Sequence, residues 1–283
     1  MSNKHGISAI IKHTLMKTIV TGICTSILLL LVSCGREIKN DAKTHEEKEL
    51  HWSYEGETSP EHWAEIEKNS DCSGTSQSPI NIIDVNTISE SPEESMLAFY
   101  YSEKTVLNKV RNNGHSIQYD FERGDSIRNK NINYNLVQIH FHEPSEHTIN
   151  GVRYPIEIHL VHQSDQKNYT VIGIMGIEGG ESHFMEEMES YLPLEVNEEK
   201  VIDKSFDIRT ILPENKDFYT YQGSLTTPPC TENVQWIILK NPLELSLEEV
   251  LRLKSNMPLK NYRNEQALND RKVYLIKEVN GSN

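Results

Sequence analysis

The stretch YNLVQIHFHEPSEHTING, residues 134–151, first alternates polar and apolar side chains and then turns. Alternate residues of a β-strand point to the same face of a sheet, so Gln138, His140 and His142 share one face. The Asn-Gly pair at 150–151 is a turn signal. The pattern therefore predicts a strand with two histidines on one face, followed by a turn that brings the chain back beside it.

A second strand pattern, YPIEIHLVH at 154–162, follows this turn and places Glu157 and His159 on one face. When the two strands pair, His140, His142 and His159 converge. Three neutral imidazoles with one open coordination position are typical of catalytic zinc, and the sequence offers no thiolate nearby to close the shell. We therefore predict a Zn²⁺ site with His140, His142 and His159 as its ligands.

Two further polar residues lie on the same faces, each two positions before a predicted ligand. Gln138 precedes His140, and Glu157 precedes His159. A carbonyl or carboxylate oxygen behind a metal-binding histidine accepts the hydrogen of the outer ring nitrogen and fixes the ring. We expect Gln138 and Glu157 to have this supporting role.

A different metal site remains open at this point. His140, His142 and Glu146 also fit the first ligand motif of the cupins, in which the glutamate binds iron or manganese. The second cupin motif requires Pro-x-Gly before its histidine, whereas Pro-Ile-Glu at 155–157 precedes His159, which favours zinc. Other histidines are expected to be surface residues or hydrogen-bonded core groups: His147, His162 and His183.

The rest of the chain is also rich in strand patterns. Period-two alternation covers residues 110–121, 169–177 and 234–240, and turn signals lie between them. Helical signals are fewer: an amphipathic segment at 182–192 and a capping box that begins at Ser246. Strands do not alternate regularly with helices, so the fold class is mainly β (α+β), with one domain and a few short helices.

The first 33 residues have the features of a secretory signal. They contain three lysines, no acidic residue and an apolar run that is short for a bilayer span. Met16 is an alternative start, because the segment that begins there is already a complete signal. Leu-Val-Ser-Cys at 31–34 resembles a bacterial lipobox, in which Cys34 would become the lipidated first residue. An ordinary signal peptide with an incidental cysteine is the alternative.

The segment after Cys34 predicts an anchored, exported protein. Residues 34–50 are polar and read as a solvated tether, residues 51–278 as the folded domain and residues 279–283 as a polar tail. Gly35 lacks the aspartate associated with inner-membrane retention, which favours the outer membrane, facing the periplasm or the cell surface. Removal of residues 1–33 takes away three lysines and changes the formal charge from −14 to −17, which argues against nucleic acid as a partner.

Four cysteines remain to be assigned. Cys24 lies in the signal and Cys34 is the lipidation candidate, which leaves Cys72 and Cys230 in a compartment that permits disulfides. We predict that these two pair. Two free buried thiols are the alternative.

Several separated motifs resemble the α-class carbonic anhydrases, in particular their bacterial members. The resemblance covers roughly residues 51–275 and implies a large twisted, mostly antiparallel central sheet with a conical cleft that reaches the zinc. It also implies reversible hydration of CO₂ to bicarbonate and a proton, by attack of a zinc-bound hydroxide with a histidine as proton shuttle. The motifs are HWSYEG (51–56), PEHW (60–63), QSPINI (77–82), NNGHSIQ (112–118), QIHFHEPSEHTING (138–151), EIHLVH (157–162), YTYQGSLTTPPCTENVQW (219–236) and NYRNEQ (261–266).

The resemblance assigns roles by position. His140, His142 and His159 match the zinc ligands. Thr226 matches the threonine that accepts a hydrogen bond from the hydroxide and donates its own to a glutamate, here Glu146. Thr227 matches a threonine beside the bicarbonate. The apolar wall for CO₂ would consist of Val161, Val171, Leu225, Val234 and Trp236.

The same resemblance implies a path for protons. His115 matches the shuttle, since an imidazole can accept a proton at neutral pH and release it to buffer. The Asn-Gly pair at 113–114 fits a tight turn that presents His115, although a simple hairpin explains the glycine equally well. Tyr54, Asn113 and Gln118 match polar residues that order water between zinc and shuttle. The family position of Gln118 is often asparagine in animal members. Cys72 and Cys230 fall where bacterial members have a disulfide, which supports their pairing.

Two other functions compete with that of a zinc lyase. Some relatives of this fold lack a zinc ligand and bind partners instead, but all three predicted ligands are present here, together with Glu146, Thr226 and His115. A cupin-type oxygenase would contain iron. Dimers are common among bacterial members, and no apolar patch in the sequence decides between a monomer and a homodimer.

Overall fold

The computed structural model describes residues 51–90, 97–258 and 260–278. The predicted signal, tether and polar tail, including Cys34, lie outside the described residues. In the part that is described, no helix is both long and apolar enough to cross a membrane.

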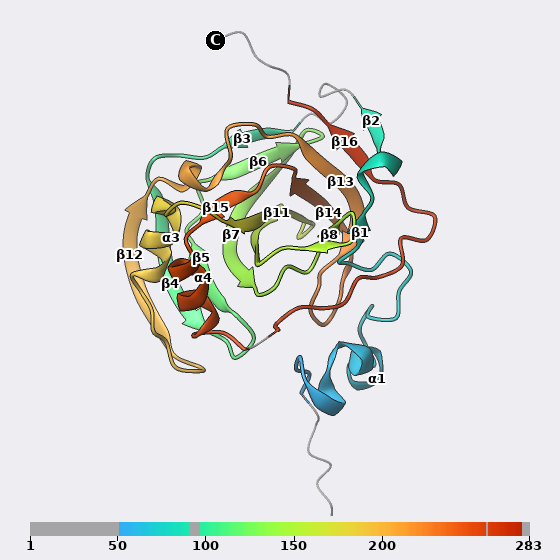
Figure 1. Cartoon of the computed structure of the whole chain (residues 1–283), viewed down its shortest axis with the longest axis horizontal. Coiled ribbons are helices and arrows are strands. Elements are labelled where there is room, and N and C mark those ends of the chain that lie inside the picture. The colour runs from blue at the N-terminus through green and yellow to red at the C-terminus, as the bar shows by residue number, and fades with distance from the viewer. Residues whose placement is uncertain (1–50, 91–96, 259, 279–283) are drawn as a thin grey trace, which may run out of the picture. The chain divides into compact units, whose positions relative to one another are not determined.

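A large, twisted 13-stranded sheet dominates the structure (Figure 1). Its neighbouring strands are mostly antiparallel, and a few pairs are parallel. This architecture confirms the predicted fold class. Across the sheet the order is β12 (Glu199–Phe206), β4 (Thr105–Asn112), β5 (Ile117–Phe121), β7 (Ile132–His142), β10 (Ile156–Gln163), β11 (Tyr169–Glu178), β14 (Glu232–Leu239), β13 (Phe218–Ser224), β16 (Tyr274–Ile276) and β2 (Ile88–Glu90).

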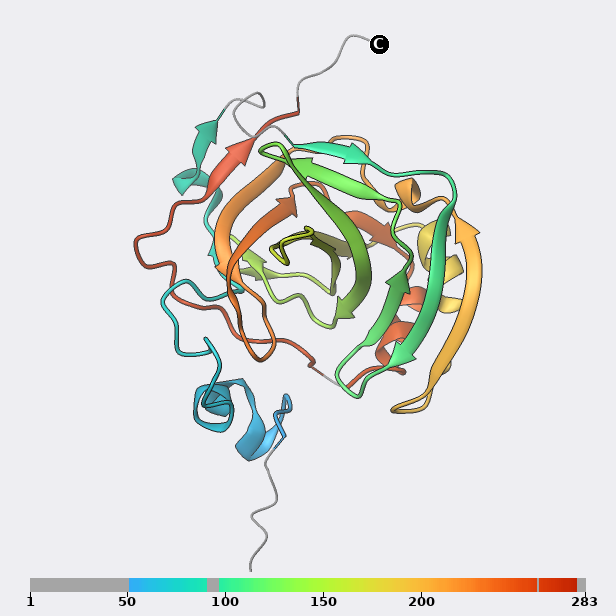
Figure 2. The same ribbon diagram turned by 180° about the vertical axis from the view of Figure 1, so that it is seen from behind.

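Shorter strands complete the sheets. β15 (Leu243–Leu245) pairs with β11, while β6 (Ser126–Asn129) pairs with β7 and with β3 (Ala98–Tyr100). A separate three-stranded sheet consists of β1 (Asn81–Ile82), β8 (Thr148–Ile149) and β9 (Val152–Arg153). Seen from behind, the long strands β4 and β12 curve along one edge of the large sheet (Figure 2).

The helices are short, and two of them lie side by side next to β12, β4 and β5 (Figure 1). Both predicted helices are present, and the predicted capping box forms between Ser246 and Glu249. The helix within residues 182–192 is capped by Ser182, whose side chain accepts from Met185 N, and it ends at Glu189. The α-helices are α1 (Trp63–Ile66), α3 (His183–Glu189) and α4 (Leu247–Lys254), and the 3₁₀ helices are η1 (Gly56–Thr58), η2 (Pro60–His62), η3 (Asp84–Asn86) and η4 (Ile208–Ile211).

The prediction of one strand over residues 110–121 was wrong. The segment forms the antiparallel pair β4–β5 with a turn between Asn112 and Ile117. Gly114 has φ +81°, and the Asn113 side chain accepts hydrogen bonds from the backbone N–H groups of His115 and Ser116. Alternation continues through such a hairpin, so periodicity alone could not separate one strand from two.

The two faces of the sheet pack into different apolar clusters. On β14, Ile237 and Leu239 belong to the larger cluster, whereas Val234 and Trp236 belong to the smaller one on the opposite face. On β10 the same alternation places Val161 in the smaller cluster. The histidines predicted to bind metal lie on this second face.

Candidate metal centre and active site

The register of β7 against β10 brings the three predicted ligands together. His140 lies directly opposite His159, and His142 lies opposite Glu157. Ring centroids are 4.9 Å apart for His140 and His142, 5.0 Å for His140 and His159, and 4.6 Å for His142 and His159. The strand pattern alone therefore predicted both the pairing and the convergence.

The outer nitrogens of two of these rings have side-chain acceptors at the predicted positions. His140 Nδ1 lies 2.8 Å from Gln138 Oε1, and His159 Nε2 lies 2.9 Å from Glu157 Oε1. A ring that donates from its outer nitrogen keeps a lone pair on its inner nitrogen. Gln138 and Glu157 thus leave His140 Nε2 and His159 Nδ1 able to bind a cation.

The third ring has a partner that the sequence analysis did not identify. His142 Nδ1 lies 2.6 Å from the backbone oxygen of Asn261, a residue within the NYRNEQ motif. The inner nitrogen of His142, Nε2, is buried and has no hydrogen-bond partner among the described residues. A buried nitrogen without a partner is costly, so this atom indicates a ligand that the protein atoms do not supply.

The donor set fits zinc. The inner nitrogens of His140 and His159 are 3.3 Å apart, close to the roughly 3.3 Å expected for two nitrogens at ~2.0 Å from one tetrahedral zinc. Burial lowers the pKa of His140 and of His159, and it lowers that of His142 to about 4, so all three rings are neutral at pH 7. These three rings form a group of potential metal ligands that does not include Glu146, unlike a cupin site.

Glu157 is a buried centre of hydrogen bonds behind the ligands. Besides His159, its carboxylate accepts from the backbone of Glu146 and His147, both at 2.8 Å, and lies 2.7 Å from His147 Nδ1. Burial would raise the pKa of Glu157, but the adjacent His147 and His159 hold it well below its usual value. His147 also contacts the Tyr221 hydroxyl at 2.7 Å, so it is a hydrogen-bonded core group, as expected.

Glu146 and Thr226 lie beside the inner nitrogens. Glu146 Oε1 accepts from Arg263 N at 2.9 Å, and Oε2 lies 3.4 Å from His142 Nε2. Burial raises the pKa of Glu146 to about 7, and the nearby Thr226 hydroxyl lowers it in part. Oε2 has no hydrogen-bond partner within the described residues, so it is available to accept a hydrogen bond from the Thr226 hydroxyl.

A small pocket of about 160 Å³ opens over His140 and His159. Most of the predicted wall is present, but Val234 is buried in the adjacent cluster and does not line the pocket. Tyr169 lines it and was missed, although its place two residues before Val171 on one strand face could have indicated it. The lining is Gln138, His140, His159, Val161, Tyr169, Val171, Leu225, Thr226, Thr227 and Trp236.

The predicted shuttle lies at the β4–β5 turn among aromatic rings. The His115 ring stacks on Trp52 with centroids 3.8 Å apart and planes 15° from parallel, and Tyr54 is edge-on at 6.2 Å. Burial lowers the pKa of His115, and the neighbouring His51 lowers it further. His115 is half-buried, so its ring lies between the protein interior and solvent.

Two of the predicted water-ordering residues, Asn113 and Gln118, lie near each other. Asn113 Nδ2 donates to Gln118 Oε1 at 3.4 Å, and Gln118 lies opposite His140 in the register of β5 and β7. Gln118 Nε2 donates to Asp120 at 2.6 Å, a contact the sequence analysis did not foresee. Burial and the charge of Glu146 raise the pKa of Tyr54, which therefore keeps its hydroxyl proton.

The predicted disulfide is present. Cys72 and Cys230 are bonded, and Cys230 N donates to Thr227 O at 2.8 Å. Gln77 donates to the backbone oxygen of Cys230 at 3.2 Å. The bond therefore joins the loop that presents Thr226 and Thr227 to the N-terminal part of the domain.

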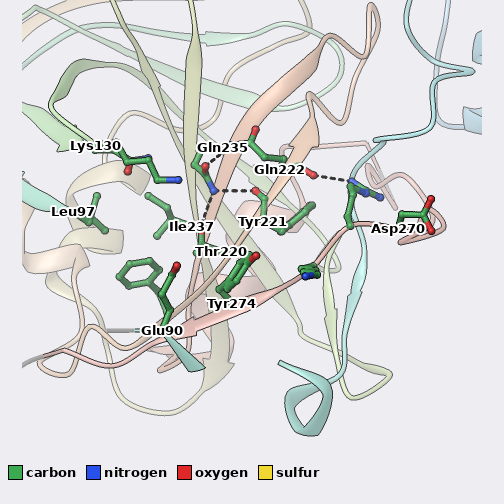
Figure 3. A pocket seen from close by; sticks show the side chains of 14 residues that line it. Glu90, Leu97, Lys130, Thr220, Tyr221, Gln222, Gln235, Ile237, Asp270 and Tyr274 are labelled. Carbon is green, nitrogen blue, oxygen red and sulfur yellow. Dashed lines mark hydrogen bonds between the residues drawn. The ribbon is translucent and has the colours of Figure 1, made fainter. Parts of the chain in front are cut away.

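A larger hollow of about 400 Å³ lies away from these residues (Figure 3). Its lining includes Thr220, Gln222, Gln235 and Ile237, whereas Trp236 lines the smaller pocket. By strand alternation the hollow is on the opposite face of β13 and β14. It contains none of the predicted site residues, whereas several of them line the smaller pocket.

Comparisons with known proteins identify the family of this chain. The family model for eukaryotic-type carbonic anhydrase matches residues 58–277. A carbonic anhydrase of Pectobacterium atrosepticum is 33% identical over 248 residues, which are 87% of this chain and 96% of that protein. The chain belongs to the eukaryotic-type, or α, carbonic anhydrase family, a family of lyases.

Solved structures of similar proteins have the same fold as this chain. The α-carbonic anhydrase of Thermovibrio ammonificans, determined with the inhibitor sulfanilamide, has a TM-score of 0.75 and 37% identity, covering 80% of this chain and 99% of that one. Dioscorin, determined with ascorbate, has a TM-score of 0.74 and 29% identity, covering 82% of this chain and 100% of that one. A similar fold thus occurs with a different bound molecule, so the reaction must be argued from the site.

Proposed function

We propose that this protein catalyses the reversible hydration of CO₂ to bicarbonate and a proton, with one Zn²⁺ held by His140, His142 and His159. The observation that supports this most directly is the buried His142 Nε2, which has no partner among the described residues and lies beside two other neutral, inward-facing ring nitrogens. In a member of the carbonic anhydrase family, three such nitrogen donors fit the zinc ion that CO₂ hydration requires.

The residues around the site would orient both the metal ligands and the attacking oxygen. When bound, zinc lowers the pKa of water to about 7, an established property of this enzyme class. Gln138, Glu157 and the Asn261 carbonyl hold the three rings with their lone pairs inward. The Thr226 hydroxyl, with Glu146 as its acceptor, would accept a hydrogen bond from the oxygen nucleophile. One lone pair of that oxygen is then directed into the pocket.

The pocket wall suits a small neutral substrate. Val161, Val171, Leu225 and Trp236 present apolar surface next to His140 and His159. CO₂ has no charge and needs no hydrogen bond there, whereas bicarbonate is charged and favours departure to water. Thr227 would contact the bicarbonate.

Each turnover also releases a proton that must leave the cleft. His115 would take it up through water ordered by Tyr54, Asn113 and Gln118, and release it to buffer. The lowered pKa of His115 keeps the ring unprotonated, and so able to accept, at neutral pH.

A CO₂-hydration assay combined with metal analysis tests this function. We expect one zinc per chain, loss of activity with a chelator and recovery when zinc is added back. Iron in place of zinc, or a chain that binds a ligand but shows no hydration with zinc bound, would contradict the proposal.

The same chain would act outside the cytoplasm as a lipid-anchored protein of the outer membrane. Support comes from the basic, then apolar segment before Cys34 and from the Leu-Val-Ser-Cys sequence at 31–34. Labelled palmitate should be incorporated into the wild-type chain and not into Cys34→Ala. Incorporation into both would exclude Cys34 as the anchor.

A further inference from the structure

His51, to which the sequence analysis gave no role, lies against the predicted shuttle. The Nε2 atoms of His51 and His115 are 3.3 Å apart, with ring centroids at 5.4 Å and planes at 50°. In a hydrogen bond between these two atoms, one nitrogen donates and the other accepts. A single proton therefore lies between a half-buried ring and an exposed one.

Three contacts hold His115 in place, two through its backbone and one through its ring. Asn113 Oδ1 accepts from His115 N at 2.9 Å, and Asn261 Nδ2 donates to His115 O at 2.9 Å. The ring itself stacks on Trp52. Backbone and ring are thus both fixed, and the free edge of the ring faces His51.

The environment favours movement of a proton outward. Burial lowers the pKa of His115, and a charge on His51 lowers it further, so the two rings resist being protonated together. His51 is exposed and keeps its hydration when it is charged. A proton that arrives from the cleft is therefore better accommodated on the outer ring.

We propose that His51 is the outer acceptor of a two-histidine relay, in which His115 passes each proton on to His51 before it reaches buffer. This inference rests on the proposed function. His115 gains a proton at Nδ1 and loses its Nε2 hydrogen to Nε2 of His51, which becomes an imidazolium. His51 then gives a proton to buffer, and exchange with solvent restores the starting tautomer of His115.

Exchange of ¹⁸O between CO₂ and water, measured on the zinc-loaded full chain, separates the two halves of the reaction. In His51→Ala we expect proton-dependent release of labelled water to fall by roughly 3- to 10-fold, less than the ~10²-fold contribution of a general acid–base group itself. The interconversion of CO₂ and bicarbonate should stay unchanged, and added imidazole should restore the loss. His183→Ala, which removes another exposed imidazole, should change neither rate.

The effects of replacing the two histidines on water release should also be non-additive. Once His115 is replaced by alanine, a further His51→Ala change should have no effect on water release, because the proton no longer passes through His115. Equal losses from His51→Ala in the presence and absence of His115 would show that the rings act independently and would overturn the relay.

A titration followed by ¹H–¹⁵N NMR tests the contact without any turnover. Replacement of His51 by alanine removes a like charge, so the pKa of His115 should rise. An unchanged pKa, or equal losses in interconversion and in water release, would reduce His51 to a structural neighbour. If His51→Ala releases water at the wild-type rate while His115→Ala does not, the relay is wrong and the proposed function stands. No exchange by the wild-type protein would overturn both.

Discussion

The metal centre and the rim of the cleft are built in different ways. At the centre, His140, His142 and His159 are held by paired strands, and each ring has one fixed acceptor behind it. At the rim, His115 lies on a turn and His51 near the start of the described domain. The rim is ordered by aromatic contacts and the centre by the sheet.

This difference separates two kinds of requirement. Binding a cation needs several lone pairs fixed at once, which a sheet register provides. Handing a proton to solvent needs one ring that reaches both water and the interior, which a turn provides. Asn261 connects the two regions, because its backbone oxygen accepts from His142 and its side chain donates to the backbone of His115.

The largest expected effect is at the centre. His140→Ala removes one of three lone pairs, so the variant should lose zinc and its hydration rate should fall to that of the uncatalysed reaction. Metal analysis and a CO₂-hydration assay measure both. The exposed His183→Ala serves as the control. Hydration that survives in a zinc-free His140→Ala variant would show that the ligands were assigned wrongly.

Removal of the disulfide should act on the rim and not on the metal. Cys72 and Cys230 are 158 residues apart and belong to a cluster with Trp63, packed against Trp52 and Tyr54. Replacing both cysteines by serine should lower the free energy of unfolding by about 2–5 kcal/mol. Chemical denaturation measures this, and zinc content should stay at one per chain. A variant that folds but loses its zinc would show that the two regions are not separable.

The sequence predicted the centre better than the rim for a physical reason. Strand alternation fixes which residues share a face, so it was enough to place Gln138 behind His140 and Glu157 behind His159. It could not find Asn261, because that contact joins segments 119 residues apart through a backbone atom. At the rim, alternation did not reveal the turn before His115, which only the Asn-Gly pair at 113–114 indicated.

The residues of the pocket wall also show how far strand alternation can predict a site. Val234 alternates correctly with Trp236 and belongs to the same apolar cluster, yet Trp236 lines the pocket and Val234 does not. Tyr169 has the same spacing from Val171 and does line it. Alternation gives the face of a residue, whereas its depth depends on the twist and on the loops that cover each strand end.

Loss of the shuttle should slow the reaction without touching the metal. In weak buffer, His115→Ala should lower turnover by on the order of 10²-fold, and imidazole should restore it, because a soluble base replaces the missing acceptor. Zinc content and kcat/KM should stay at wild-type values. A variant that is insensitive to imidazole would remove the shuttle role and leave the metal centre intact.

The smallest effects should come from the acceptors behind the ligands, and they should differ from each other. Glu157→Gln should weaken zinc binding by about 10- to 100-fold, because an amide has one acceptor oxygen in place of two that now receive the His159 ring, the His147 ring and two backbone N–H groups. Gln138→Ala removes one contact to His140 at the pocket, where water can replace the amide, so its effect should lie at or below ~10-fold. Competition with a chelator measures both affinities. Equal losses would mean that the sheet register alone orients the rings, and that the fixed acceptors add little to the difference between centre and rim.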